Sequence, residues 1–170
     1  TDSSDSEYRM KMTRSDDYYY QAHLNAMFDI NENRYTDLVI QPRPCMNENR
    51  AFCTMVDRNT ISGLFIFIAD RGYATFNNIA HVLEAGQFFL IRVKSPTSSG
   101  SFLKGLIEPG LETDETVHFG LTYSHDKLYG EHSQQYKRLK KDRTFDFIPN
   151  TDTQSVYHMD FRCVCIRLES

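Results

Sequence analysis

The alternation of apolar and polar positions predicts four strands in the first half of the chain. Tyr18 to Ile30 and Tyr35 to Gln41 favour two strands, and the polar stretch INENR between them has the length of a hairpin turn. Downstream, LFIFIA (64–69) and QFFLIRVK (87–94) are unbroken apolar runs, typical of strands that are buried on both faces.

Two stretches between these strands have helical spacing instead. Asn47 is a good N-cap for the first, whose apolar positions lie on one side of a helix opposite polar ones. The second runs from Thr75 to Ala85 and ends at Gly86, which suits a C′ position. Residues 18–94 therefore predict an antiparallel pair followed by two right-handed crossovers, which together form one mixed α/β sheet with flanking helices.

The composition changes after residue 94. SPTSSGS is typical of a loop, and three further strands are predicted beyond it, at Thr116–Tyr123, Thr144–Ile148 and Tyr157–Leu168. We therefore expect a polar lead-in over residues 1–17, a sheet-and-helix core over 18–94 and a β-rich region over 95–170.

Length and composition narrow the class of protein. The chain has 170 residues, a size typical of one domain, and a net charge of −4, which argues against a uniformly basic nucleic-acid binder. Its apolar runs are far shorter than the ~20 residues needed to cross a bilayer, so no membrane partner is expected. The first residues are polar and acidic, unlike a signal peptide, and lack an initiator Met, which suggests a piece of a longer protein.

The cysteines and histidines show no spacing that favours a zinc site. We expect Cys45, Cys53, Cys163 and Cys165 to be reduced thiols in a cytoplasmic protein. His81 falls on the second predicted helix, where a structural role is the simpler interpretation.

One short segment is strongly basic. Between Gln135 and Arg143 a single acidic residue, Asp142, accompanies five basic ones: Lys137, Arg138, Lys140, Lys141 and Arg143. The charge pattern alone favours a solvated face over a contact with phosphate.

Asp70 is the strongest candidate for chemistry. It directly follows an apolar strand, and ligands of open α/β sheets gather outside the carboxyl ends of such strands. An ionised carboxylate beside a buried strand is costly to leave unpaired, so we expect it to have a functional role or a local partner. Two interpretations stay open: Asp70 caps the following turn or pairs with Arg71, or it holds a metal ion or acts in catalysis.

At this point a family resemblance becomes visible. IADRGYATFNNIAHVLEAGQFFLIRVKS (68–95) resembles the segment around the second catalytic aspartate in DDE transposases of bacterial insertion sequences, in the group with a β-rich insertion before the catalytic glutamate. HLNAMFDI (23–30), YTDLVIQP (35–42) and NENRAF (47–52) resemble the elements before this aspartate, and TFDFIP and FRCVCIRL resemble the close of the insertion. The order and spacing of these motifs make the resemblance specific from about Tyr18 to Ser170.

The resemblance implies a ribonuclease H-like fold and metal-dependent phosphoryl transfer. In that family three acidic side chains hold two divalent ions, usually Mg²⁺, one activating a water or 3′-hydroxyl and the other stabilising the leaving oxygen. Asp70 matches the second acidic member. Asp2 is a candidate for the first, although a disordered polar lead-in is the favoured interpretation there. The setting Tyr-x-x-Arg-x-x-x-Glu of the third does not occur, and Glu169 lies too close to the end.

We therefore expect the chain to be the central fragment of a transposase catalytic domain, inactive by itself. DNA, at element ends and target, and a second transposase protomer are the implied partners. The candidate DNA contacts are Arg71, Arg92, Lys94, Lys137, Arg138, Lys140 and Lys141. The alternative for each is a solvated position, and for Arg71 an ion pair with Asp70 is slightly favoured. Tyr73 could stack on a displaced base, although packing under the turn is commoner.

Two other hypotheses predict different surroundings for Asp70. A non-catalytic nucleic-acid or protein interaction module on the same sheet predicts Asp70 buried in a salt bridge. A complete small hydrolase would need Asp29, Asp37 and Asp70 to share metal ions, although the first two flank a hairpin, where a solvent-facing position is expected.

Overall fold

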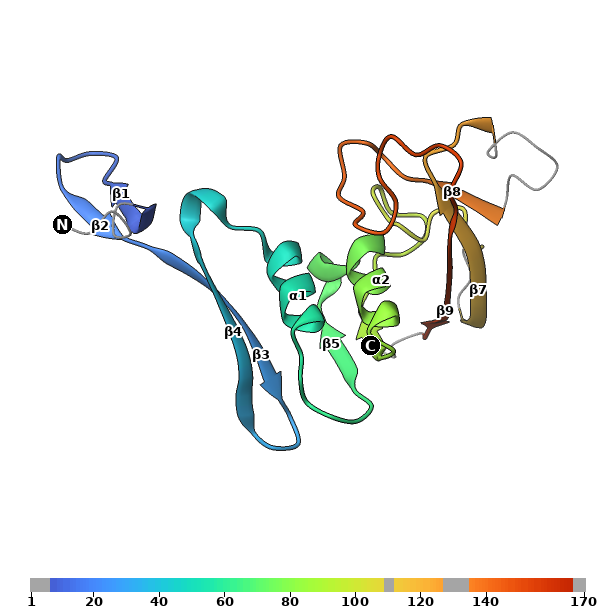
Figure 1. The fold of residues 1–170 in the computed structure, drawn as a ribbon, viewed down its shortest axis with the longest axis horizontal. Helices are drawn as coiled ribbons and strands as arrows, with labels where there is room; N and C mark the ends of the chain where they lie inside the picture. The colour runs from blue at the N-terminus through green and yellow to red at the C-terminus, as the bar shows by residue number, and fades with distance from the viewer. Residues whose placement is uncertain (1–6, 109–111, 127–134, 167–170) are drawn as a thin grey trace. The chain divides into compact units, whose positions relative to one another are not determined.

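The computed structural model describes residues 7–108, 112–126 and 135–166, and the chain divides into two compact units, Thr1–Leu64 and Phe65–Ser170. Figure 1 shows the elements of both. No helix within the described ranges is long and apolar enough to span a bilayer. The four cysteines are free thiols.

The first unit consists of two antiparallel strand pairs and a helix. The predicted hairpin is confirmed, with Ala22 paired to Pro42 at its open end and Asp29 to Arg34 at its turn. A further short pair precedes it, in the stretch where a polar lead-in was predicted. The elements are β1 (Arg9–Lys11), β2 (Tyr18–Tyr20), β3 (Ala22–Asp29), β4 (Arg34–Pro42), η2 (Arg43–Cys45) and α1 (Glu48–Asp57).

Helix α1 forms where the sequence predicts it. The Asn47 side chain accepts a hydrogen bond from the Arg50 backbone N–H, which satisfies one of the N–H groups left open at a helix start. Its apolar side packs on β3 and β4, and Ala51, Cys53 and Val56 are almost fully buried. The polar Asn25 of β3 is also buried, and its side-chain amide donates to the Gln41 side chain.

The second unit joins a strand–helix–strand crossover to a three-stranded sheet. β5 and β6 are parallel, as the predicted crossover requires, with Ile66 opposite Phe88. In the other sheet β7 lies between β8, which is parallel to it, and β9, which is antiparallel. The elements are β5 (Ile66–Ala69), η3 (Arg71–Tyr73), α2 (Phe76–Glu84), β6 (Phe88–Ile91), β7 (Thr113–Thr122), β8 (Tyr136–Arg138) and β9 (Tyr157–Cys165).

One aromatic core holds this second unit together. The side chains of α2 and β6 pack with those of β7 and β9, and the Phe119 and Phe161 rings meet at 5.8 Å between centroids. Residues on both sides of the predicted boundary at 94/95 therefore share a core. The division into a catalytic core over 18–94 and an inserted region over 95–170 stays a prediction.

The hairpin β3–β4 is a two-stranded sheet of the first unit, and the parallel pair β5–β6 is a two-stranded sheet of the second. Two structural expectations are wrong. Residues 144–148 form turns and no strand, because Phe145 and Ile148 point into the core while the backbone is used for turns and side-chain contacts. β5 is buried on one face only: Ile66 and Ile68 are exposed, since α2 and the β-rich region cover the opposite face.

Glycine at position 120 is required by space in the core sheet. A Cβ atom there would lie 2.6 Å from Val156 Cγ1 and 2.8 Å from Tyr136 Cδ1. We expect Gly120→Ala to lower the free energy of unfolding by about 1–3 kcal/mol, the usual cost of overpacking a core. Urea denaturation measures this. Thr116→Ala, at an exposed position of the same strand, is the control and should change stability by less than about 0.5 kcal/mol.

Candidate functional site

Asp70 lies where the sequence places it, directly after the carboxyl end of β5. Its side chain is exposed, and Oδ1 accepts a hydrogen bond of 2.7 Å from the Gly72 backbone N–H, so Asp70 caps the turn η3. Within the described residues Oδ2 has no hydrogen-bond or ion-pair partner. The cap therefore fixes one carboxylate oxygen and leaves the other directed to solvent.

The turn after Asp70 is held against α2 by two polar side chains. Thr75 caps the helix by accepting a hydrogen bond from the Asn78 backbone N–H at 3.2 Å. The fully buried Asn78 donates its side-chain amide to the Tyr73 carbonyl at 3.0 Å. Gly72 allows the close approach of the carboxylate, because a Cβ atom on it would lie 3.0 Å from Asp70 Oδ1.

The basic residues near Asp70 stay available to an external anion. Arg71 is exposed and forms no ion pair with Asp70, so the local pair expected from the sequence is wrong; the cap from Gly72 takes its place. Because β5 and β6 are parallel, Arg92 leaves β6 at the same sheet edge, and its backbone N–H donates to the Ala69 carbonyl at 3.4 Å. The side chains of Arg92 and Lys94 are exposed.

The basic segment divides into one anchored cation and several exposed ones. Lys137, in β8, is half-buried, and its ammonium donates to the Lys104 carbonyl oxygen. Burial, with a smaller effect from the positive charge of Lys104, lowers the pKa of Lys137. Arg138, Lys140 and Lys141 are exposed.

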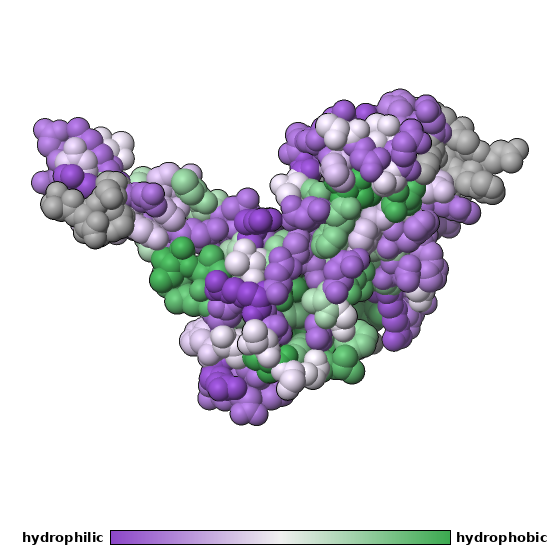
Figure 2. Space-filling view, in the orientation of Figure 1, coloured by the Kyte–Doolittle hydropathy of each residue, from purple (hydrophilic) through white to green (hydrophobic). Residues whose placement is uncertain are grey.

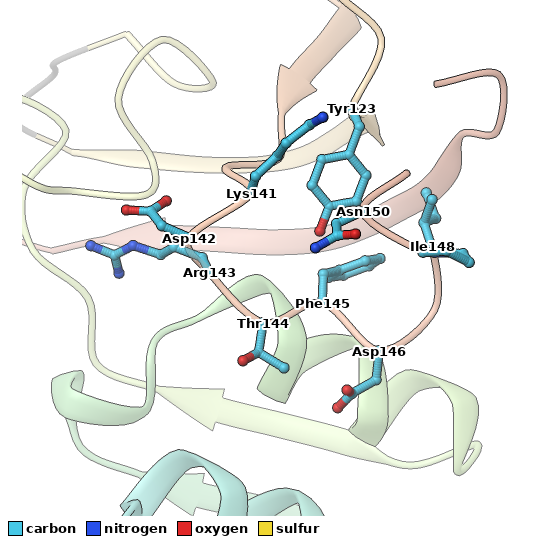
Figure 3. A pocket seen from close by; sticks show the side chains of 10 residues that line it. Tyr123, Lys141, Asp142, Arg143, Thr144, Phe145, Asp146, Ile148 and Asn150 are labelled. Atoms are coloured by element: carbon cyan, nitrogen blue, oxygen red, sulfur yellow. The ribbon is translucent and has the colours of Figure 1, made fainter. Parts of the chain in front are cut away.

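A cavity of about 390 Å³ opens beside this segment (Figure 3). The ring of Tyr123 is part of the core, and its hydroxyl reaches the cavity near Asn150. Burial raises the pKa of Tyr123. The cations Lys141 and Arg143 lie on the lining together with the acids Asp142 and Asp146, so the cavity has no dominant charge.

A polar clamp that the sequence does not reveal joins α2 to the turn after this segment. Asn77 and Asp146 exchange two hydrogen bonds: the Asp146 backbone N–H donates to Asn77 Oδ1 at 2.8 Å, and Asn77 Nδ2 donates to Asp146 Oδ2 at 3.0 Å. His81 Nε2 lies 2.9 Å from the same Oδ2, and its ring packs on Phe147 at 4.9 Å between centroids. The structural role predicted for His81 agrees with this buried position.

A further contact ties the end of α2 to β9. The hydroxyl of Tyr157 donates to Glu84 Oε1 at 2.8 Å. Burial, together with this bond to a carboxylate, raises the pKa of Tyr157 above its usual range. Helix α2 therefore contacts the Asp70 turn, the 144–149 turn and β9.

Two members of the alternative acidic set, Asp29 and Asp37, have local partners within the first unit. Asp29 accepts hydrogen bonds from the backbone N–H groups of Asn31 and Glu32 in the hairpin turn. Asp37 forms a two-point ion pair with Arg58, at 2.7 and 2.5 Å, which holds the pKa of that carboxyl below its ordinary value. No group of three metal-ligating side chains occurs in the part of the chain that the structure describes.

Two acidic residues weighed in the sequence analysis lie outside the described residues. Asp2, the candidate first ligand, belongs to the stretch 1–6, and Glu169, which was set aside as the third, belongs to 167–170. Among residues 7–108, 112–126 and 135–166, Asp70 does not form the buried salt bridge that the interaction-module hypothesis predicts, since its carboxylate is exposed and accepts a hydrogen bond from Gly72.

Comparison with models of known protein families gives a match over most of the chain. A family model described as a transposase DDE domain matches residues 2–155. No curated protein and no solved structure matches the chain.

The close contact between Asp70 and Gly72 predicts an energetic coupling. In Gly72→Ala the new methyl group must displace the Asp70 carboxylate, whereas in the Asp70→Ala background that neighbour is gone. We expect a coupling energy of about 0.5–1 kcal/mol between the two substitutions, measured by urea denaturation of the four members of a double-mutant cycle. Additive effects would show that Gly72 is not packed against the carboxylate.

The pair of Asp37 and Arg58 predicts a pH dependence of stability. Since the folded-state pKa of Asp37 lies below the unfolded value of about 3.9, the pair stabilises the fold above that pH and its contribution is lost as the pH falls through the folded pKa. We expect Asp37→Asn to lower the urea midpoint at pH 7, and we expect its difference from the wild type to shrink steadily as the pH is lowered below about 4. Glu32→Gln, at an exposed position in the turn between β3 and β4, is the control. An unchanged difference at both pH values would contradict this role.

Proposed function

The chain belongs to the transposase DDE domain family, and from this membership we propose that it is the central part of the catalytic domain of a bacterial insertion-sequence transposase. The family implies a parent enzyme that transfers phosphoryl groups on DNA with the help of metal ions. The proposed reaction is cleavage at the element ends, followed by joining of the 3′-hydroxyl groups to target DNA.

The observation that carries the proposal is the position and state of Asp70. It follows a strand of a parallel pair, at the edge where open α/β sheets hold their ligands. One carboxylate oxygen is fixed by the Gly72 N–H and the other is free and exposed, which suits a group that coordinates a cation. A buried, fully paired aspartate would have favoured a structural role.

The oxygen chemistry of Asp70 fits Mg²⁺, because this hard cation prefers carboxylate ligands. When bound, a pair of such ions activates the attacking hydroxyl and stabilises the leaving oxygen. We propose Asp70 as one ligand. A single carboxylate holds Mg²⁺ weakly, and no three-residue metal cluster lies within residues 7–108, 112–126 and 135–166, so we further propose that the isolated chain does not cleave DNA.

The arrangement of strands supports a ribonuclease H-like core in this proposal. It contains an antiparallel hairpin, followed by a helix and then by a parallel pair joined through a second helix, the order in which the motifs of the resembled transposases occur. The three-stranded sheet after residue 94 corresponds in order to the β-rich insertion of that group.

For DNA we propose two contact regions. Arg71, Arg92 and Lys94 lie around the sheet edge that carries Asp70, where they would position phosphates. In the basic segment, Arg138, Lys140 and Lys141 are the exposed cations, while Lys137 is committed to the Lys104 carbonyl and would contribute mainly by anchoring β8. The insertion is also the region through which we propose contact with a second protomer.

Metal binding tests the role of Asp70. We expect Mn²⁺, added to the chain in NMR titrations, to broaden the backbone amide signals of residues 70–72 at lower concentration than those of other exposed acidic positions. Asp70→Asn should abolish this selectivity, and Asp142→Asn, the matched exposed control, should leave it unchanged. Equal broadening in the wild type and Asp70→Asn would remove the support for a catalytic carboxylate.

DNA binding tests the basic segment separately. The triple variant Arg138→Ala, Lys140→Ala and Lys141→Ala should weaken binding to a labelled duplex and reduce the slope of log K against log salt concentration by about 2–3, since each phosphate contact contributes close to one unit. Arg14→Ala, Arg34→Ala and Arg162→Ala make an equal change in charge at exposed positions outside the proposed DNA contacts and serve as the control. An equal loss in both triples would show that only net charge matters.

A further inference from the structure

The short β1–β2 hairpin exposes three consecutive tyrosines. The exposed fractions are 51 % for Tyr18, 38 % for Tyr19 and 65 % for Tyr20. Large aromatic side chains normally contribute to a core or to an interface, so three exposed rings on a strand of three residues need a physical reason. Figure 2 shows mainly hydrophilic residues on this part of the surface, and Met12 is the further large apolar side chain of the hairpin that is exposed, at 50 %.

Strand pairing puts two of the tyrosines on one face with two cations. Arg9 lies opposite Tyr20 and Lys11 opposite Tyr18, and directly paired residues share a face of an antiparallel ladder. The Arg9 guanidinium lies 3.8 Å from the centroid of the Tyr18 ring, a cation–π contact that keeps a positive charge beside the aromatic surface. Tyr18, Tyr20, Arg9 and Lys11 form what we call the tyrosine face.

The other face anchors the hairpin to the rest of its unit. Arg43 Nη1 donates to the Tyr19 hydroxyl at 3.4 Å and to the Gln21 side-chain oxygen at 2.6 Å. The Gln21 backbone N–H donates to the Tyr8 carbonyl at 2.9 Å. The tyrosine face is therefore presented on a fixed two-stranded platform.

The acidic residues of the hairpin lie in its turn rather than on this face. Asp16 pairs with Lys11 at 2.9 Å, and both side chains are exposed, so the pair is weak and exchangeable. Asp17 accepts a hydrogen bond from the Ser15 hydroxyl at 2.9 Å. The ligand that suits exposed rings with cations between them is a chain of planar bases joined by phosphates.

We propose that the tyrosine face binds an unpaired segment of DNA, with bases stacked on Tyr18 and Tyr20 and phosphates near Arg9 and Lys11. The inference rests on the proposed function, because it takes DNA as the substrate. Stacking on an exposed ring needs the face of a base, and a closed duplex presents only base edges and phosphates. Unpaired strands are therefore preferred over duplex.

Fluorescence anisotropy of labelled oligo(dT) and of a duplex of equal length tests the proposal on the complete chain. The wild type should bind oligo(dT) more tightly than the duplex. Tyr18→Leu with Tyr20→Leu should weaken oligo(dT) binding by at least roughly tenfold, because two stacking contacts are lost. Tyr18→Phe with Tyr20→Phe keeps both rings and should bind within about twofold of the wild type.

Tyr35→Leu is the matched control, since Tyr35 is 74 % exposed but lies outside the tyrosine face. It should leave oligo(dT) binding unchanged. Equal affinity for duplex and oligo(dT), loss of binding in the Phe pair, or no effect of the Leu pair would each overturn the proposal. Circular dichroism and urea midpoints show whether the Leu pair has lost the hairpin. If it has, its binding result is set aside, and the binding of the Phe pair is used to judge the proposal.

The outcome is separable from that of the proposed function. The proposed function depends on duplex binding through Arg138, Lys140 and Lys141 and on metal binding at Asp70. If those effects are present while the tyrosine variants bind oligo(dT) like the wild type, only the present inference fails. If oligo(dT) binding depends on the rings but Asp70 binds no metal ion, the catalytic proposal fails and the tyrosine face stands.

Discussion

The structure of Phe65–Ser170 depends on the burial of helix α2. Asn78, Ile79, Ala80 and Val82 are almost completely excluded from solvent, and the aromatic core forms around this helix. Because protein interiors are close-packed, a helix that is buried in this way fixes the positions of the segments that contact it. The Asp70 turn contacts it through Asn78, and the turn at 144–149 contacts it through Asn77 and His81.

This arrangement links two regions that are far apart in the sequence. Asn77 and Asn78 are neighbours on the helix, yet one side chain holds the 144–149 turn and the other holds the Asp70 turn. Buried polar contacts of this kind define one geometry, because leaving either partner without its hydrogen bond would be costly. Helix α2 thus fixes the position of the basic segment, which ends directly before Thr144, relative to Asp70, the candidate metal ligand.

Local patterns in the sequence predicted the elements well and their assembly poorly. Caps and periodicity identify α1 and α2 because Asn47, Thr75 and Gly86 act within one turn of the helix ends. The failed strand at 144–148 has the alternation of a strand, but Phe145 and Ile148 meet a core built by distant residues, and Asp146 meets Asn77, 69 positions earlier. No window of neighbouring residues contains that information. The same limit applies to Arg71. Its expected partner, Asp70, accepts a hydrogen bond from the Gly72 backbone N–H instead.

The open face of β5–β6 has a consequence for handling the protein. Ile66, Ile68, Phe88 and Leu90 are exposed and share one face of the two-stranded parallel sheet, because Ile66 pairs with Phe88 and Ile68 with Leu90. Parallel sheets in folded proteins are usually covered on both faces, and exposed apolar strands promote self-association. An uncovered apolar face of this kind favours self-association, so we expect low protein concentration and mild detergent to help keep the chain monomeric in solution.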